Sequence, residues 1–222
     1  FKNFEYIVID GNSTDGTYLQ IKKFNKLNKF KIIRRQDKSY YDSLNFGIKK
    51  SKGEFIGVLN SRDIFVNDKI LKKINVNLIK NKQIFYSNLI FKKKKSIVRT
   101  WEHKILNITN NNLFKIPHST LFLKKNIYKK VGLYNLKYKI SSDLDFMIRL
   151  SKKYNDIYHI NFCSICMEYG GLSTNLKSLK LKLKEDFTIL IKHYRFRFII
   201  YYFLKIYFKI IDFKLFNFIR SI

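Results

Sequence analysis

Short apolar runs alternate along this chain with longer segments whose apolar residues recur at helical spacing. The first run, at residues 7–9, leads directly into Asp10. Similar runs predict strands at 31–34, 54–59 and 84–88, and a further strand beginning near 117. The intervening segments predict helices at 18–28, from about 40 to Gly53, at 67–80, through Val131 and opening at 141–150. Continuous apolar runs are typical of strands buried on both faces, so the pattern predicts an α/β fold with a mostly parallel sheet flanked by helices.

The loop after the first strand carries the first candidate site. Asp10 stands at the carboxyl end of that strand, which is where open α/β sheets bind their ligands. Gly11 and Gly16 allow a tight turn, and Ser13 or Thr14 can cap the helix that follows. These residues are equally compatible with a carboxylate that faces a binding crevice and with an ordinary connection between a strand and a helix.

Polar residues that could take part in binding or catalysis recur further along the chain. The predicted strand at 54–59 ends in the tetrapeptide Asn60, Ser61, Arg62 and Asp63, so a second carboxylate reaches the tip of a buried strand. His118 follows Pro117, where it either contacts a substrate or closes a turn.

Asp143 and Asp145 lie in the first turn of the helix predicted at 141–150. Carboxylates at this end of a helix interact favourably with its dipole, which by itself explains their presence. Residues two positions apart point to different sides of a helix, so at most one of the two should line a crevice.

Two short features carry weaker signals. Lysines at 92–95 stand between strand-like segments and predict the solvated tip of a hairpin. Cys163 and Cys166 are the only cysteines, and a lone C-x-x-C pair is a weak zinc signal. Their apolar neighbours instead favour two strand thiols in a reducing cytoplasm.

After residue 176 the composition of the chain becomes more basic and aromatic. We therefore expect two units, a domain at 1–176 and a basic, aromatic helical tail at 177–222. The apolar runs of the tail are too short to span a bilayer. Lys205, Lys209 and Asp212 form one polar stripe on an otherwise apolar helix, which favours an in-plane helix with its lysines on anionic headgroups. The alternative is a C-terminal helix packed on the catalytic core or on a partner subunit.

The formal net charge of +29 over 222 residues would usually indicate nucleic acid or an anionic membrane as a partner. The chain contains no alanine, and its abundance of Lys, Asn, Ile, Phe and Tyr resembles the bias of an AT-rich genome. Its aromatic residues cluster in the apolar tail, and no nucleic-acid recognition motif is present, so we do not expect nucleic-acid binding.

Five segments then combine into a family resemblance: IDGNSTDGT at 9–17, DKSYYDSLNFGIKKSKGEFIGVLNSRD at 37–63, PHSTLFLKK at 117–125, SSDLDFMIRL at 141–150 and GGLS at 170–173. In this order they resemble the family 2 glycosyltransferases with a GT-A fold, in particular bacterial enzymes that build surface polysaccharides of the colanic-acid type. The resemblance implies a Rossmann-like GT-A sheet. It also implies transfer of a hexose from a nucleotide-sugar donor to a glycan or lipid-linked acceptor, with inversion, by an enzyme that is cytoplasmic and peripheral on the inner face of the cell membrane.

The resemblance also implies roles for the matching donor-side residues. Asp10 would contact the nucleotide base or ribose, and Asp15 would shape the same loop. Lys38 and Asp42 would flank the nucleotide pocket. The tetrapeptide at 60–63 departs from the family's acidic motif. Asn60 can still hydrogen-bond a ribose hydroxyl, and Arg62 either replaces part of the metal's charge or reaches a phosphate.

The remaining roles concern the reaction itself. Asp63 matches the last aspartate of the family's metal-binding motif and would hold Mg²⁺ or Mn²⁺ on the donor diphosphate. Asp143 matches the general base that takes the proton of the acceptor hydroxyl. His118 and Asp145 are further candidates on the acceptor side.

The sequence departs from the family pattern in three places. Only the last position of the tetrapeptide at 60–63 is acidic, and Ser39 stands where glycine is usual. The family also has a strand and a helix before the position of Phe1. We therefore expect a fragment or clipped chain that binds sugar nucleotides poorly by itself, and the alternative function is a catalytically inactive glycosyltransferase-like scaffold.

Overall fold

The computed structural model describes residues 3–28, 30–78, 81–94, 96–168 and 176–219. The motif GGLS at 170–173 lies outside these residues. In chain order the elements are β1 (Ile7–Asp10), α1 (Thr17–Asn28), β2 (Lys31–Arg34), α2 (Tyr40–Lys50), β3 (Phe55–Gly57), β4 (Ile64–Phe65), α3 (Ile70–Leu78), β5 (Ile84–Lys93), β6 (Ser96–Trp101), η1 (Leu113–Lys115), η2 (His118–Thr120), β7 (Phe122–Lys124), α4 (Lys125–Val131), α5 (Ser142–Lys153), β8 (Tyr158–Glu168), α6 (Leu176–Tyr194), η4 (Arg195–Arg197) and α7 (Phe198–Ile219). Each strand and helix expected before the tail has a counterpart in this order.

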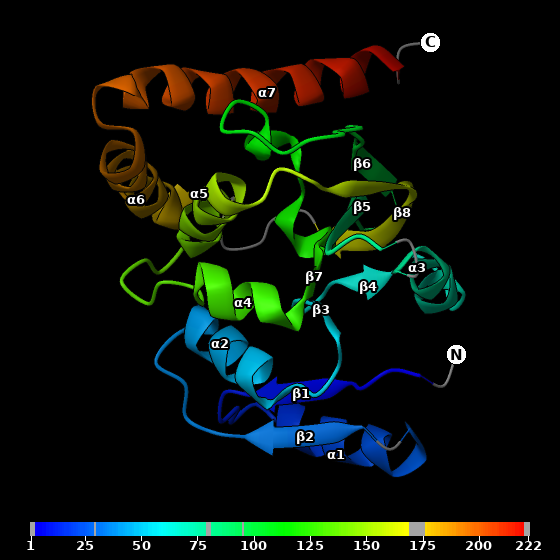
Figure 1. Cartoon of the computed structure of the whole chain (residues 1–222). Helices are drawn as coiled ribbons and strands as arrows, with labels where there is room; N and C mark the ends of the chain where they lie inside the picture. Colours follow the sequence, from blue (N-terminus) through cyan, green and yellow to red (C-terminus); the bar gives the residue numbers. More distant parts are fainter. Residues whose placement is uncertain (1–2, 29, 79–80, 95, 169–175, 220–222) are drawn as a thin grey trace.

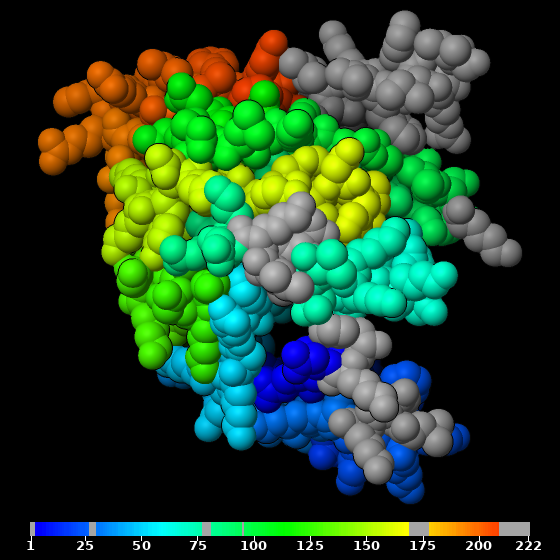
Figure 2. Space-filling model, turned by 45° about the vertical axis from the view of Figure 1, so that its right-hand side comes forward, coloured from blue at the N-terminus to red at the C-terminus, as the bar shows by residue number. Residues whose placement is uncertain are grey.

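The strands form two separate sheets (Figure 1). β1 and β2 make a two-stranded parallel sheet in which Asp10 lies opposite Arg34. The other strands make a six-stranded sheet in the order β3-β7-β5-β8-β4, with β6 paired to the outer half of β5. In the space-filling view a cleft separates β1 and β2 from β4 and α3 (Figure 2).

The six-stranded sheet is mixed, so the expectation of a mostly parallel sheet is not confirmed. β5 and β8 pair in parallel, whereas β3 with β7, β5 with β7, β5 with β6 and β4 with β8 pair antiparallel. The lysine-rich turn between β5 and β6 is a tight hairpin with Lys94 at a φ of 56°, and such a short connection permits only antiparallel pairing. The hairpin expected at 92–95 is thereby confirmed.

Helices α4 and α5 pack on the six-stranded sheet and enclose the main hydrophobic core (Figure 1). Its fully buried side chains include Ile84, Leu123, Ile127 and Ile148, contributed by two strands and two helices. This is the arrangement that apolar strands followed by amphipathic helices predict.

Helix α2 joins the small sheet to the large one. On one side Asn45 exchanges two hydrogen bonds with the backbone of Tyr134, at 2.8 and 2.9 Å. On the other side Gly47 lies against Ile9 of β1, where a Cβ would come within 2.9 Å of the Ile9 Cδ1 atom. The absence of a side chain at Gly47 lets the first strand approach the helix closely.

The tail consists of two helices, α6 and α7, and α7 lies at the end of the molecule opposite the β1–β2 sheet (Figure 1). Helix α7 packs on the main core through Phe198, Tyr201 and Tyr202. This agrees with the alternative expectation of a C-terminal helix packed on the core. Lys205 also points inward, with its ammonium 2.5 Å from the Asp186 carboxylate of α6. The expectation that Lys205 lies on lipid headgroups is therefore wrong, because a buried carboxylate attracts it inward.

The side chains of Lys209 and Asp212 lie outside the described part of the structure. No helix among the described residues is long and apolar enough to cross a membrane.

The two cysteines lie on β8, as expected of strand thiols, and both are free. The Cys163 thiol lies 3.7 Å from the Glu102 carboxylate, and burial, with help from Glu102, raises its pKa to about 11. A thiol with a raised pKa is a poor metal ligand at neutral pH, which agrees with the weakness of the zinc signal.

Candidate active site

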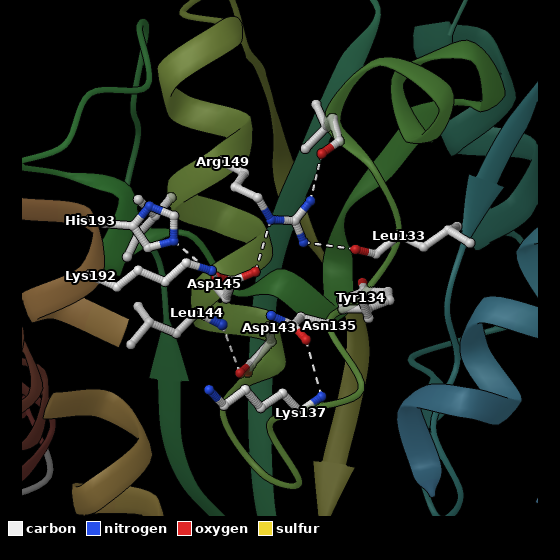
Figure 3. A network of polar contacts seen from close by, with 12 residues as sticks. Leu133, Tyr134, Asn135, Lys137, Asp143, Leu144, Asp145, Arg149, Lys192 and His193 are labelled. Carbon is white, nitrogen blue, oxygen red and sulfur yellow. Dashed lines mark hydrogen bonds and ion pairs between the residues drawn. The ribbon is translucent and has the colours of Figure 1, made fainter. Parts of the chain in front are cut away.

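The two aspartates of α5 leave the helix in different directions (Figure 3). Asp143 points toward α2 and η2, and its side chain is partly exposed. Asp145 points toward α6 and is 1% exposed. The two carboxylates thus face different sides of the helix, as residues two positions apart should, so at most one of them can line a given crevice.

One carboxylate oxygen of Asp143 is held by hydrogen bonds, and the other is available to accept a proton. Its Oδ1 accepts a hydrogen bond of 2.8 Å from the backbone N–H of Leu144 and lies 3.4 Å from the Tyr41 hydroxyl. Its Oδ2 lies 3.4 Å from Nδ1 of His118. A carboxylate held in this way can receive a proton on Oδ2 while its orientation is maintained through Oδ1.

Asp145 takes part in a buried network instead of a binding site. It accepts hydrogen bonds of 2.8 Å from Nε of Arg149 and from Nε2 of His193 (Figure 3). Arg149 in turn donates to the carbonyl oxygens of Val131 and Leu133. Burial raises the pKa of Asp145, but the hydrogen bonds from His193 and Arg149 outweigh it and lower the pKa below its usual value. The acceptor-side role expected for Asp145 is therefore not supported.

The tetrapeptide at 60–63 forms a turn that places Asp63 in the site. The backbone N–H of Asp63 donates to the Asn60 carbonyl at 3.0 Å, and the Asn60 amide donates to the Asp63 carboxylate at 2.8 Å. Asp63 is 8% exposed. Its burial raises the pKa of the carboxyl, and nearby His118 acts in the opposite direction. His118 thus lies 3.4 Å from Asp143 and is close enough to Asp63 to act on its pKa.

Arg62 does not take the direction expected of a phosphate ligand. Its backbone has a φ of 70°, in the left-handed region, which turns the exposed side chain toward solvent. The guanidinium lies 3.7 Å from the Glu168 carboxylate at the end of β8. Unusual backbone conformations of this kind often occur at functional sites.

The residues expected on the donor side around β1 are engaged in their own loops. The Asp10 carboxylate, almost fully buried, accepts a hydrogen bond from the backbone N–H of Ser13 and lies 3.4 Å from the Nε atom of Arg34. Asp15 accepts a hydrogen bond of 3.1 Å from the backbone N–H of Thr17 at the start of α1. Contacts of this kind are typical of a helix cap, and they shape the loop as expected of Asp15.

Lys38 and Asp42 flank the loop that leads into α2. The Asp42 carboxylate accepts hydrogen bonds of 3.1 Å from the backbone N–H of Lys38 and from Arg35. These bonds, the first above all, lower the pKa of Asp42. The Lys38 side chain is exposed and remains available for a ligand.

Tyr40 and Tyr41, at the start of α2, also belong to this site, and sequence reasoning missed them. The Tyr40 hydroxyl donates to the Asn60 side chain, and the Tyr41 hydroxyl donates to the Ile140 carbonyl at 2.7 Å. Burial raises the pKa of Tyr41 far above its usual value, so it remains a hydrogen-bond donor at any working pH. The only sequence signal was an aromatic pair at a predicted helix start, which is equally common in a core.

Asp63 has the properties of a ligand for a divalent cation. Other buried aspartates in the described residues have cationic partners: Asp10 has Arg34, Asp145 has Arg149 and Asp186 has Lys205. Asp63 has the amide of Asn60 as its hydrogen-bond partner and His118 nearby, and no lysine or arginine pairs with it among the described residues. No group of three or more metal-binding side chains occurs among the described residues. Since Mg²⁺ commonly binds one or two carboxylates together with substrate phosphates, a single uncompensated carboxylate fits such an ion.

The fold has counterparts among solved structures. It resembles crystal structures of S. aureus TarS with TM-scores of 0.65 for the whole protein and 0.66 for its residues 1–349 in complex with UDP-GlcNAc. The matches cover 85% and 86% of this chain, and 34% and 58% of the respective TarS chains, at 17% and 15% identity. This likeness confirms an α/β fold of the GT-A type.

The family model of glycosyl transferase family 2 matches residues 1–156, and the chain belongs to this family. It is 30% identical over 170 residues to an uncharacterized glycosyltransferase of Rickettsia typhi, a match that covers 70% of this chain and 53% of that relative. It is 27% identical over 195 residues to the Escherichia coli UDP-Glc:alpha-D-GlcNAc-diphosphoundecaprenol beta-1,3-glucosyltransferase, over 86% of this chain and 75% of the relative. A PGL/p-HBAD biosynthesis glycosyltransferase of Mycobacterium tuberculosis is 26% identical over 186 residues, which cover 78% of this chain and 69% of that protein. The family and the enzyme class, a transferase, are thus as the sequence predicted.

Proposed function

We propose that this protein transfers a sugar from a nucleotide-sugar donor to a glycan or lipid-linked acceptor in the synthesis of bacterial surface polysaccharide, with inversion at the anomeric carbon. The observation that carries the proposal is that contacts link three separate segments: Asp143 lies beside His118 and the Tyr41 hydroxyl, and the adjacent Tyr40 binds Asn60, the hydrogen-bond partner of Asp63. The names of the relatives support the substrate classes, since one uses UDP-Glc and an undecaprenyl-diphosphate acceptor.

In this mechanism Asp143 takes the proton of the acceptor hydroxyl through Oδ2 as the oxygen attacks the anomeric carbon. The bond from that carbon to the diphosphate breaks in the same displacement, so the anomeric centre inverts. Leu144 and Tyr41 hold the carboxylate in place, and His118 supports its charge. General-base catalysis of this kind contributes about 10²–10⁴-fold to the rate.

Asp63, with Asn60 beside it, would hold Mg²⁺ or Mn²⁺ near the donor diphosphate. A divalent ion bound there neutralises charge that develops on the leaving diphosphate. The nucleotide would bind beside the β1 loop with Asp10 and the exposed Lys38, as the family resemblance implies.

The test compares Asp143→Asn with Asp145→Asn in the protein as the gene encodes it, using UDP-glucose and UDP-N-acetylglucosamine as donors. We expect Asp143→Asn to lower turnover by about 10²–10⁴-fold and to leave donor binding unchanged. Asp145→Asn should lower the turnover of folded molecules far less, because its carboxylate faces α6. A fully active Asp143→Asn variant would exclude this residue as the base.

The role of Asp63 is tested by calorimetry with UDP-glucose in the presence and absence of Mn²⁺. Asp63→Asn keeps the side-chain volume and removes the anionic ligand, so we expect it to abolish the Mn²⁺-dependent part of donor binding as well as transfer. Donor binding without turnover in the parent protein would instead favour the inactive scaffold.

We also propose that the outer face of α7 rests on an anionic membrane. Large apolar side chains recur there at helical spacing and are exposed: Ile199, Ile200, Phe203, Ile206 and Tyr207, preceded by Phe196 of η4. The inner face is already occupied by the core and by Asp186, so this apolar stripe has no partner within the described chain. A helix that is apolar on both faces needs a second apolar surface.

Charge favours a lipid surface as that partner. The acidic residues between 178 and 208 are Glu185 and Asp186, and both point inward. The exposed charged residues of the same segment are all basic: Lys180, Lys184, Lys192, Arg195 and Arg197. Apolar side chains flanked by cations and free of exposed carboxylates complement anionic headgroups over acyl chains.

Sedimentation with vesicles tests this surface. Phe203→Ser should strongly reduce binding to phosphatidylglycerol vesicles. The matched control is Leu19→Ser, on α1 at the opposite end of the molecule, which should leave binding unchanged. The two side chains are similarly exposed, at 64% for Phe203 and 70% for Leu19. The parent protein should also bind phosphatidylcholine vesicles more weakly than phosphatidylglycerol vesicles. Dimerisation that Phe203→Ser abolishes, with no vesicle binding by the parent, would show that a second copy covers the stripe instead.

A further inference from the structure

Glu185 of α6 binds the backbone of the loop that leads into α5. Its Oε1 accepts a hydrogen bond of 2.8 Å from the backbone N–H of Lys139, and its Oε2 accepts bonds of 2.9 Å from the N–H groups of Ile140 and Ser141. Glu185 is 8% exposed, so these bonds form largely out of water. Three successive amides on one carboxylate form a strong, charge-assisted contact.

This loop is the point where the catalytic side chains meet. The carbonyl of Ile140 accepts the Tyr41 hydroxyl at 2.7 Å, and the same hydroxyl lies 3.4 Å from the Asp143 carboxylate. Asp143 follows Ser141 by two residues. A displacement of the loop therefore moves both the Tyr41 contact and the first turn of α5.

The α5 N-terminus is held only in part by its own side chains. Ser141, the residue before the helix, makes no capping hydrogen bond with its side chain, whereas Asp143 accepts a hydrogen bond from the backbone N–H of Leu144. Carboxylates are favourable at a helix start. Glu185, from a helix distant in sequence, holds the residues that lead into the first turn through the three backbone N–H groups at 139–141.

Helix α6 is itself fixed behind Glu185. Asp186, the next residue, is buried and pairs with Lys205 of α7 and with Lys182 of α6. The contact from Glu185 to the loop is thus made from a helix that is anchored on its other side.

We propose that Glu185 is a positioning residue for the base Asp143: it holds the loop at 139–141 so that the Asp143 carboxylate faces the acceptor hydroxyl. This inference rests on the proposed function. Glu185 lies beyond residues 1–156, which the family model matches, so no family motif assigns it a role.

The main variant is Glu185→Gln, in which an amide can accept from the loop through only one oxygen. We expect the kcat of the folded protein to fall on the order of 10–100-fold, the scale of a small misplacement of a catalytic group, with the Kd for UDP-glucose little changed. The unfolding midpoint should also fall, because buried amides of the loop lose their carboxylate partner. Thr188→Ala, one turn further along α6 at an exposed position, is the matched control and should keep the parent kcat.

A double-mutant cycle separates positioning from general damage. If Glu185 acts through Asp143, Glu185→Gln should cause no further loss in an Asp143→Asn background. An equal loss in both backgrounds, or a parent-like kcat in folded Glu185→Gln, would overturn the proposal. If Asp143→Asn is fully active while Glu185→Gln is slow, the base assignment has failed and not the effect of Glu185.

Glu185→Asp is the second variant if Glu185→Gln does not fold. It keeps the charge but is one methylene shorter, so we expect a smaller fall in kcat in the same direction. An unchanged kcat in folded Glu185→Asp, with the Asp143 dependence intact, would then contradict the positioning role.

Discussion

The small β1–β2 sheet with α1 and the large six-stranded sheet with α4 and α5 differ in how they are held together. Among the described side chains of residues 3–40, Asp10 alone is buried, whereas the larger sheet and its helices enclose the whole main core. The smaller part is held by polar contacts, such as Asp10 with Arg34, and by its packing on α2.

This difference divides the candidate site into two parts. Asp63, His118 and Asp143 stand on the well-packed sheet and its helices, where catalytic groups need to be held accurately. Asp10, Asp15 and Lys38 stand on the loosely packed part, where we expect local opening at lower free energy. A ligand that contacts both parts would stabilise the smaller one most.

Substitution of a buried aspartate in each part should give the largest difference in unfolding free energy between the two parts. Asp145→Asn leaves Arg149 and His193 without their carboxylate, and breaking a buried pair costs about 3–5 kcal/mol of unfolding free energy. Asp10→Asn removes a pair whose other member, Arg34, is half-exposed, and the amide oxygen can still accept from the backbone N–H of Ser13, so we expect a smaller loss of about 1–3 kcal/mol. Urea unfolding of both variants measures the difference, and equal losses would mean that the parts are equally well packed.

The same carboxylate predicts a pH dependence. The folded-state pKa of Asp145 is lowered, so its stabilising contribution is present above the unfolded pKa of about 3.9 and is lost as the pH falls through the lower folded value. Acid unfolding of the parent should therefore be steeper than that of Asp145→Asn. Identical acid transitions would show that the network does not depend on the charge of Asp145.

Matched isoleucines give the next contrast. Ile148→Ala on α5 removes a fully buried side chain and should cost about 2–5 kcal/mol. Ile9→Ala on β1 removes a half-buried one, and less apolar area returns to water, so we expect about 1–2 kcal/mol. The unfolding midpoints in urea give both values, and a larger loss for Ile9→Ala would show that β1 belongs to the main core.

The smallest effect is expected at the contact between the two parts. Gly47→Ala gains helix propensity of about 0.5–1 kcal/mol, but its Cβ would lie 2.9 Å from the flexible end of Ile9. These terms nearly cancel, so we expect a net change within about 1 kcal/mol, and Ile9→Val should make the substitution more favourable. A loss of several kcal/mol for Gly47→Ala in thermal unfolding would mean that β1 cannot shift.

Local sequence patterns determined most of the elements. The apolar run before Asp10, the polar loop entering α2 and the carboxylates at the start of α5 each fall where expected, because strand and helix periodicity are properties of short segments. The five motif segments likewise placed Asp63 and Asp143 as candidates, and the family assignment is confirmed.

Strand direction, the partners of charges and the course of the tail were decided only by the tertiary structure. An apolar run in the sequence is equally compatible with parallel and with antiparallel pairing. The direction of each strand in the mixed sheet was therefore decided by which strands the connections bring side by side. The opposite surroundings of Asp143 and Asp145 depend on α2 and α6, and Lys205 turned inward because Asp186 lies beneath it. Glu185 and Tyr41 reach the loop before α5 from positions far away in the chain, and no local pattern records such contacts.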